Sequence, residues 1–262
     1  QAAAGKTIMT TEPKFVPATG AKIKVEDFTA SIRLIDCVGY IVPSAKGYED
    51  DNGPRYVMTP WYSEAIPFIE AAEIGTEKVI KDHSTIGIVV TTDGSITDIP
   101  RKDYIEAEET VITELQSIGK PYIVILNSVH PMLPETEKLA TELKEKYNVP
   151  VIPLNVENIA DRDMYNILKE ALYEFPVEEV VVNMPEWVAV LSPNHYLKKE
   201  YIKKIKESIM PINKLKDVDQ IVKNFTNSDY ISKAYLSDVD TSTGIVTLNL
   251  ESPNNLYNEV LN

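Results

Sequence analysis

The strongest constraint on the fold is an alternation of short apolar runs with amphipathic segments between residues 28 and 175. Within the segments, apolar residues recur at helical spacing, as at Val111, Leu115 and Ile118. The runs are apolar at nearly every position, which is typical of strands buried on both faces. These runs are 86–90, 122–126 and 151–154. Strand–helix alternation predicts an α/β fold, a mostly parallel sheet with helices on both faces.

Ligands of such sheets bind beyond the carboxyl ends of the strands. An earlier run, in which Phe28, Ala30, Ile32 and Leu34 alternate with polar residues, predicts a further strand that leads into Asp36-Cys37-Val38-Gly39. The loops that we expect to form a site therefore follow Ile35, Val90, Leu126 and Leu154.

The pattern changes after Pro176. Apolar runs at 180–182 and 188–191 predict two strands separated by Pro185, two amphipathic helices follow, and a hairpin through Thr243-Gly244 closes the chain. We therefore expect two domains, a larger α/β domain at 1–176 and a smaller α+β domain at 177–262.

The charge balance limits the partners. The chain has 26 Lys and Arg against 40 Asp and Glu, a net charge of −14. Duplex DNA and anionic membranes require a positive surface, so neither is expected as the main partner, and no nucleic acid is expected at all. The single cysteine, Cys37, excludes an internal disulfide and a cysteine-rich metal site.

Asp36-x-x-Gly39 at a strand end is the first candidate for chemistry. In P-loop NTPases an Asp at this place reaches Mg²⁺, usually through water, and the Gly amide approaches the γ-phosphate. An Asp that begins a turn is the alternative, and the residues alone leave both open. Thr10 and Thr11 precede this strand, where threonines of GTPase-like folds close on Mg²⁺ and the γ-phosphate, although the pair by itself fits two solvated loop residues better.

Two further positions bear on nucleotide choice. Asn127-Ser128-Val129-His130 stands where GTPases carry N-K-x-D, and His130 cannot replace the carboxylate that selects guanine. A plain Asn-Ser turn is the alternative. Tyr40 stands where many GTPases have the Gln that orients water, so hydrolysis would need another residue, for which Thr10 or Thr11 is the candidate.

Gly5-Lys6-Thr7 matches only the tail of the P-loop pattern G-x-x-x-x-G-K-S/T. The pattern needs its first Gly five residues earlier and a strand before it, and residues 1–4 cannot provide these. We interpret the segment as the start of a loop.

Longer blocks of sequence resemble the stage IV sporulation protein A family. The match extends over nearly the whole chain and is far more specific than any short motif. The blocks are 3–15, 36–40, 47–50, 52–55, 70–76, 91–94, 104–109 and 170–176.

The resemblance implies an ATPase of endospore-forming bacteria, related to translation-factor GTPases, that uses ATP and Mg²⁺. It implies a protein of the mother-cell cytoplasm, located at the outer forespore membrane, which polymerises with itself into the basement layer of the spore coat. Implied partners are other coat morphogenetic proteins and the forespore membrane, reached indirectly or through a small membrane-anchoring protein.

By the same resemblance Asp36 corresponds to the Walker B Asp, a Mg²⁺ ligand through water, and Thr10 and Thr11 correspond to threonines that act in hydrolysis. We expect Asp36, Gly39, Asn127 and Ser128 to bind the nucleotide.

Members of the family carry their P-loop upstream of the position of Gln1 and continue past that of Asn262. The implied fold is therefore a P-loop GTPase-like sheet that lacks its N-terminal strand, which would lie between the strands at 32–35 and 86–90. We expect these 262 residues alone neither to bind nor to hydrolyse ATP measurably. The alternative function is a non-catalytic GTPase-like scaffold that binds another coat protein, and a guanine-nucleotide switch is disfavoured at His130.

Overall fold

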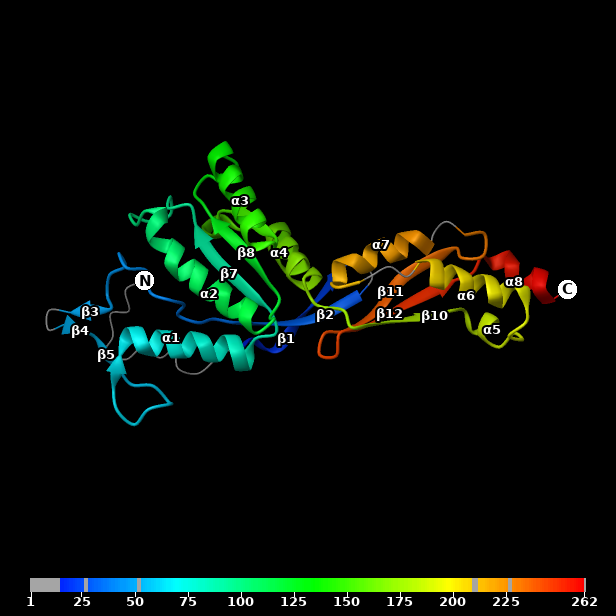
Figure 1. Ribbon diagram of the computed structural model, residues 1–262, viewed down its shortest axis with the longest axis horizontal. Coiled ribbons are helices and arrows are strands. Elements are labelled where there is room, and N and C mark those ends of the chain that lie inside the picture. The colour runs from blue at the N-terminus through cyan, green and yellow to red at the C-terminus, as the bar shows by residue number, and fades with distance from the viewer. Residues whose placement is uncertain (1–14, 26–27, 51–52, 209–211, 226–227, 262) are drawn as a thin grey trace. The chain divides into compact units, whose positions relative to one another are not determined.

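The computed structural model describes residues 15–25, 28–50, 53–208, 212–225 and 228–261. The chain forms two compact units (Figure 1). The first is built mainly from Arg33–Ala171 and the second mainly from Leu172–Asn262. Among the described residues no helix is both long and apolar enough to cross a bilayer.

The first unit contains a small parallel sheet, several helices and two short strand pairs. Its strands are β3 (Glu49–Asp50), β4 (Gly53–Pro54), β5 (Tyr56–Val57), β6 (Ile66–Pro67), β7 (Gly87–Thr92), β8 (Tyr122–Asn127) and β9 (Val151–Leu154). Its helices are α1 (Phe68–Lys78), which continues into a π-helical turn (Val79–His83), α2 (Ile105–Ser117), which follows a 3₁₀ turn (Arg101–Tyr104), α3 (Pro134–Tyr147) and α4 (Asp161–Tyr173), with a further 3₁₀ turn at Val156–Asn158.

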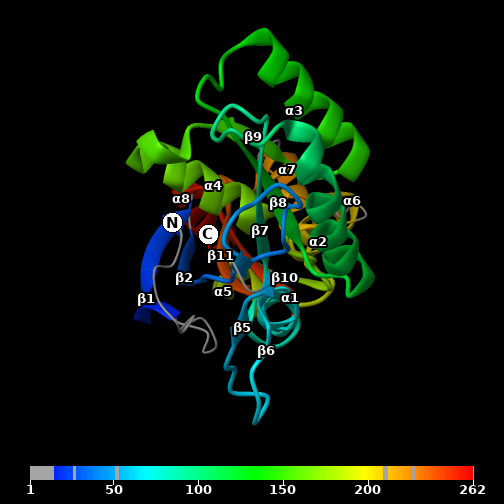
Figure 2. The ribbon, with the colours of Figure 1, turned by 90° about the vertical axis from the view of Figure 1, so that its left-hand side faces the viewer.

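The parallel sheet has the strand order β7-β8-β9. Val124 and Leu126 of β8 pack in one cluster with residues of α2 and α3, whereas Ile123 and Ile125 pack in another with residues of α4. Figure 2 shows α2 and α3 on one side of the sheet and α4 on the other. Because successive side chains point to opposite faces, burial on both faces requires apolar residues at successive positions, as at 122–126 of β8. The predicted parallel sheet with helices on both faces is confirmed.

The predicted strand at 28–35 is present as β2 (Phe28–Ile35), but it does not join the parallel sheet. It pairs with β1 (Phe15–Val25), which the sequence did not predict because Pro17 and Gly20 are unusual inside a strand. Among the described residues β7 pairs with β8 alone, so its other edge has no strand beside it.

The second unit is a mixed α+β structure, as predicted. Its sheet has the order β10-β12-β11, with β10 parallel and β11 antiparallel to β12. The predicted closing hairpin is confirmed, with Gly244 in its turn at a φ of 71°. The elements are β10 (Glu179–Asn183), α5 (Glu186–Ala189), α6 (Tyr196–Ser208), α7 (Leu215–Phe225), β11 (Lys233–Asp240), β12 (Ile245–Glu251) and α8 (Asn254–Leu261).

The predicted strand at 188–191 is wrong, because the chain forms the short helix α5 there. Pro185 occupies the N-cap position, and its carbonyl accepts the amide protons of Val188 and Ala189. Val188 is fully buried, whereas Val190 is 84% exposed. A short apolar run does not by itself distinguish a strand from a buried helical turn.

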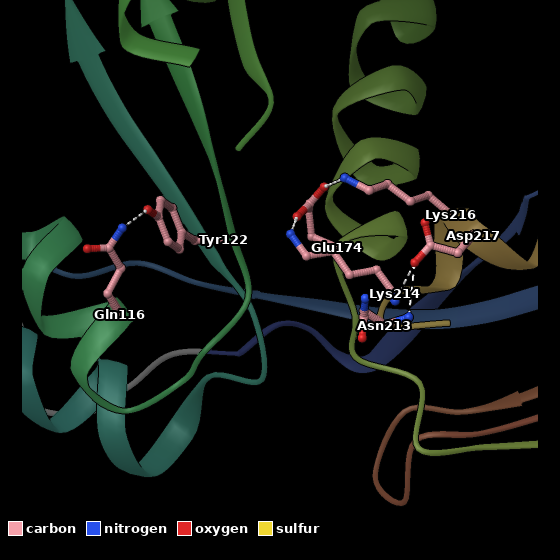
Figure 3. A network of polar contacts seen from close by, with 7 residues as sticks. All are labelled: Gln116, Tyr122, Glu174, Asn213, Lys214, Lys216 and Asp217. Carbon is pink, nitrogen blue, oxygen red and sulfur yellow. Dashed lines mark hydrogen bonds and ion pairs between the residues drawn. The ribbon is translucent and has the colours of Figure 1, made fainter. Parts of the chain in front are cut away.

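A buried carboxylate lies where α4 ends. Glu174 is almost fully buried and accepts hydrogen bonds from the ammonium groups of Lys214 and Lys216 (Figure 3). Asp217, in the first turn of α7, accepts the backbone amide protons of Asn213 (3.0 Å) and Lys214 (2.9 Å). The two lysines neutralise the buried charge, and Asp217 satisfies amides at the start of α7 that would otherwise lack an acceptor.

Candidate functional site

A cavity of about 450 Å³ lies beside the unpaired edge of β7. Its walls are Ile35 at the end of β2 and the segment 36–40 that follows it, together with residues of β7, α1 and α2. Asp36 and Gly39 line the cavity from the segment after β2. The other walls include Thr76 of α1, Thr91 of β7 and Glu108 of α2. The cavity is therefore at the carboxyl end of β2, where the sequence predicted a site.

Asp36 and Gly39 lie together in this wall. The side chain of Asp36 is exposed. Gly39 has a φ of 81°, a conformation that favours glycine, and its amide N–H donates to Oγ1 of Thr76 at 3.0 Å. An exposed carboxylate can hold a water of a hydrated Mg²⁺ ion. A phosphate oxygen that binds the Gly39 amide would have to replace the Thr76 hydroxyl.

The neighbours of these residues are not reactive groups. Burial raises the pKa of the Cys37 thiol, which disfavours the thiolate. Tyr40 donates its hydroxyl proton to Glu114 of α2, and burial together with this hydrogen bond raises the pKa of Tyr40. Tyr40 thus stays a protonated phenol bound to α2, which agrees with the expectation that it does not position water.

Asn127 and Ser128 lie at the end of β8, and neither lines the cavity beside Asp36. Oδ1 of Asn127 accepts the amide proton of Val156 at 3.0 Å. Ser128 is fully buried, and its Oγ accepts the amide proton of His130 at 3.0 Å. The structure thus brings Asp36 and Gly39 together, whereas Asn127 and Ser128 lie at the end of β8, outside the cavity lining. Thr10 and Thr11 lie outside the described residues.

Asp93, directly after β7, accepts hydrogen bonds from these loops and is not among the site residues predicted from the sequence. Its carboxylate accepts the amide proton of Ser95 at 2.9 Å and the hydroxyl of Thr136 at 3.1 Å. Burial alone would raise the pKa of Asp93, but hydrogen bonds from Ser128, Ser95 and Thr136 outweigh it and lower this pKa. The sequence feature that indicates Asp93 is a polar run at a predicted strand end, Thr91-Thr92-Asp93-Gly94.

Asp93→Ala is expected to destabilise the protein by about 1–3 kcal/mol at pH 7, since the donors on Ser95 and Thr136 lose a charged acceptor. The lowered pKa of Asp93 means that its contribution is present above the unfolded-state pKa of about 3.9 and is lost as the pH falls below it. Urea midpoints measured from pH 7 to pH 2.5 should therefore converge for the variant and the wild type. Asp98→Ala in the same loop is the control, and an equal pH dependence for all three proteins would contradict the assignment.

A second polar network, also not predicted from the sequence, surrounds Glu108, which is 4% exposed and lines the cavity. Nη2 of Arg101 lies 2.6 Å from Oε2 of Glu108, and Nη1 donates to Oγ1 of Thr91 at 3.0 Å. The hydroxyl of Tyr147 donates to Oε1 of Glu108 at 2.6 Å, and burial with this hydrogen bond raises the pKa of Tyr147 to about 12. The sequence indicates Glu108 by its position, because this charged residue falls on the apolar face of its helix between Tyr104 and Val111.

Within the part of the chain that the structure describes, no group of three or more His, Cys, Asp or Glu residues is arranged to hold a metal ion. Mg²⁺ in nucleotide sites usually has one or two protein carboxylates, with waters and phosphates as its other ligands. Asp36, exposed at the cavity, fits such a partial ligand set.

Two family models together match the whole chain. The family described as "Stage IV sporulation protein A, ATPase domain" matches residues 1–176, and the family described as "Stage IV sporulation protein A, middle domain" matches residues 177–262. No solved structure gives a significant match.

Three curated relatives are all named Stage IV sporulation protein A, and each aligns with the whole chain. The identity is 54% to the relative from Bacillus subtilis (strain 168), 53% to that from Bacillus anthracis and 46% to that from Clostridioides difficile (strain 630). The chain spans 53% of the length of each, about half. The chain belongs to the stage IV sporulation protein A family, of which it carries the ATPase and middle domains.

Proposed function

We propose that the chain is part of an ATPase that binds Mg²⁺-ATP at the edge of its α/β domain and hydrolyses it to drive self-assembly. One observation carries this proposal: the exposed carboxylate of Asp36 and the left-handed Gly39 lie together in a cavity beside the unpaired edge of β7. When bound, Mg²⁺ would neutralise phosphate charge, with Asp36 holding one of its waters and the Gly39 amide donating to a phosphate oxygen.

The unpaired edge of β7 supports a further part of the proposal. Backbone groups at a sheet edge need partners once they are covered, and an added parallel strand would supply them. We assign this place to a strand outside these 262 residues, whose following loop contributes the P-loop amides and lysine. The ATPase domain would then comprise residues 1–176 with that strand, and residues 177–262 would form the middle domain.

The experiment that tests the binding site compares two proteins by calorimetry. The 262-residue chain is expected to give no measurable heat with Mg²⁺-ATP, because its Gly5-Lys6-Thr7 segment lacks the first glycine of the phosphate-binding pattern. The same chain extended by its natural upstream residues is expected to bind. GTP should not displace ATP preferentially, since His130 cannot accept both guanine hydrogen bonds as a carboxylate does. Tight, Mg²⁺-dependent ATP binding by the shorter chain would overturn the assignment of the missing strand.

A second candidate function, a non-catalytic scaffold whose middle domain binds another coat protein, has its own supporting observation. Groups that would contact the nucleotide already bond within the protein, the Gly39 amide with Thr76 and the Asn127 side chain with Val156. In a scaffold these bonds would be permanent, and the extended chain would show no hydrolysis.

The cellular part of the proposal rests on family membership. We place the assembled protein in the mother-cell cytoplasm, in the basement layer of the spore coat at the outer forespore membrane. Its partners would be further copies of itself, other coat morphogenetic proteins and a small membrane-anchoring protein.

A further inference from the structure

Two hydrogen bonds of different kinds attach the segment after β2 to the helices around it. The backbone amide of Gly39 donates to Oγ1 of Thr76 on α1 at 3.0 Å, and the phenol of Tyr40 donates to the carboxylate of Glu114 on α2. Only the first bond uses a donor that a phosphate oxygen could also bind. When that bond is exchanged, the bond from Tyr40 still attaches the segment to α2.

Thr76 is a buried polar residue held in place by its surroundings. It is 1% exposed and lines the cavity, where its hydroxyl oxygen accepts the Gly39 amide proton. The preceding residue, Gly75, packs against Trp61, since a Cβ atom added at Gly75 would lie 3.7 Å from the indole ring. Nζ of Lys78 lies 5.5 Å from the centroid of the same ring. These contacts with Trp61 fix this part of α1, so the acceptor stays near Gly39 even when another oxygen binds the amide.

The hydroxyl of Thr76 and a terminal phosphate therefore compete for one proton donor. Gly39 is expected at the γ-phosphate, so ATP competes for its amide, whereas ADP ends at the β-phosphate and leaves the bond to Thr76 intact. The bond given up to ATP offsets part of the hydrogen bond gained, because only the difference between the two contributes to affinity. Once the γ-phosphate leaves, the hydroxyl of Thr76 accepts the amide proton again.

We infer that Thr76 is a positioning residue that lowers the affinity of the site for ATP, and not for ADP, by competing for the Gly39 amide. The inference rests on the proposed function and deepens it, since it names a residue that sets the preference between the two nucleotides. Thr76 acts through Gly39, and no contact between Thr76 and the nucleotide is required.

The first test measures the hydrogen bond itself and uses the 262-residue chain without nucleotide. Thr76→Val keeps the shape of the buried side chain and removes the acceptor. It is expected to speed amide hydrogen exchange at Gly39, followed by NMR, by about two- to tenfold, the value of one hydrogen bond. Thr76→Ser keeps a hydroxyl and is expected to exchange like the wild type.

The second test measures nucleotide affinity by calorimetry on the upstream-extended chain, with Mg²⁺ and either ADP or a non-hydrolysable ATP analogue that has all three phosphates. Thr76→Val is expected to bind the ATP analogue about two- to tenfold more tightly and to bind ADP as the wild type does. Thr76→Ser is expected to restore the wild-type ratio of the two dissociation constants.

Tyr40→Phe is the matched control, because it removes the other hydrogen bond of the same segment and leaves the Gly39 amide untouched. Any change that it causes is expected to be equal for the two nucleotides. A structural role of Thr76 in holding the segment would likewise change both affinities by the same factor.

An unchanged ratio of dissociation constants in Thr76→Val, weaker binding of the ATP analogue by that variant, or unchanged exchange at Gly39 overturns the inference. The same change of ratio in Tyr40→Phe would overturn it as well, because the effect would then come from a loosened segment. Absence of binding by the wild-type extended chain would disprove the proposed function and this inference together, whereas normal binding with an unchanged ratio would overturn the inference alone.

Discussion

Replacing Asp36 with alanine in the upstream-extended chain is expected to lower kcat for Mg²⁺-dependent ATP hydrolysis by about 100- to 1,000-fold. Asp36 is the exposed carboxylate at the cavity beside β7 and the residue that fits a Mg²⁺ water there. Without it the metal is less well placed to neutralise the charge that develops on the phosphate oxygens. Release of inorganic phosphate at saturating ATP measures the effect.

Asp98→Ala provides the matched control, because Asp98 is also exposed but follows β7 and does not line the cavity. It should leave kcat unchanged. Equal hydrolysis by the Asp36 variant and the wild type would disprove the role of Asp36. Absence of hydrolysis in every version, including the wild type, would favour the scaffold.

Glu108→Ala is expected to lower the free energy of unfolding by about 3–5 kcal/mol. The substitution removes a buried carboxylate, so that the guanidinium of Arg101 loses its counter-ion and the hydroxyl of Tyr147 loses its acceptor. Urea denaturation followed by circular dichroism gives the value.

Glu109→Ala is the control for this prediction, since Glu109 is the next residue on α2 and pairs with Lys146, the residue before Tyr147. Both partners of that pair are about half exposed, so its loss should cost less than about 1 kcal/mol. Similar losses for the two variants would show that the buried network adds nothing beyond a surface ion pair.

The parallel sheet could be predicted because burial on both faces leaves a direct mark on the sequence. Residues 122–126 are apolar without interruption, and each of them is buried. The amphipathic spacing of α2 and α3 follows from packing one face on that sheet. These local patterns depend on the residues themselves and not on which strands become neighbours.

Pairing and polar networks depend on the tertiary fold and were harder to predict. The strand at 28–35 was predicted, but its partner β1 was not, since strand pairing is set by contacts outside the segment. Asp36 and Gly39 were expected to act together and do share a cavity wall. Asp93 and Glu108 were missed because their partners, Thr136 and Tyr147, are 43 and 39 residues away in the sequence.

The hydrogen bond from Gly39 to Thr76 joins a loop to a helix that also carries Glu73 and Glu77 on its outer surface. A ligand oxygen that accepted the hydrogen bond of the Gly39 amide would displace the Thr76 hydroxyl. The loop would then be less firmly attached to α1. Ligand binding in the cavity would then change the outer surface of α1 through Thr76, which lies within one helical turn of Glu73 and Glu77.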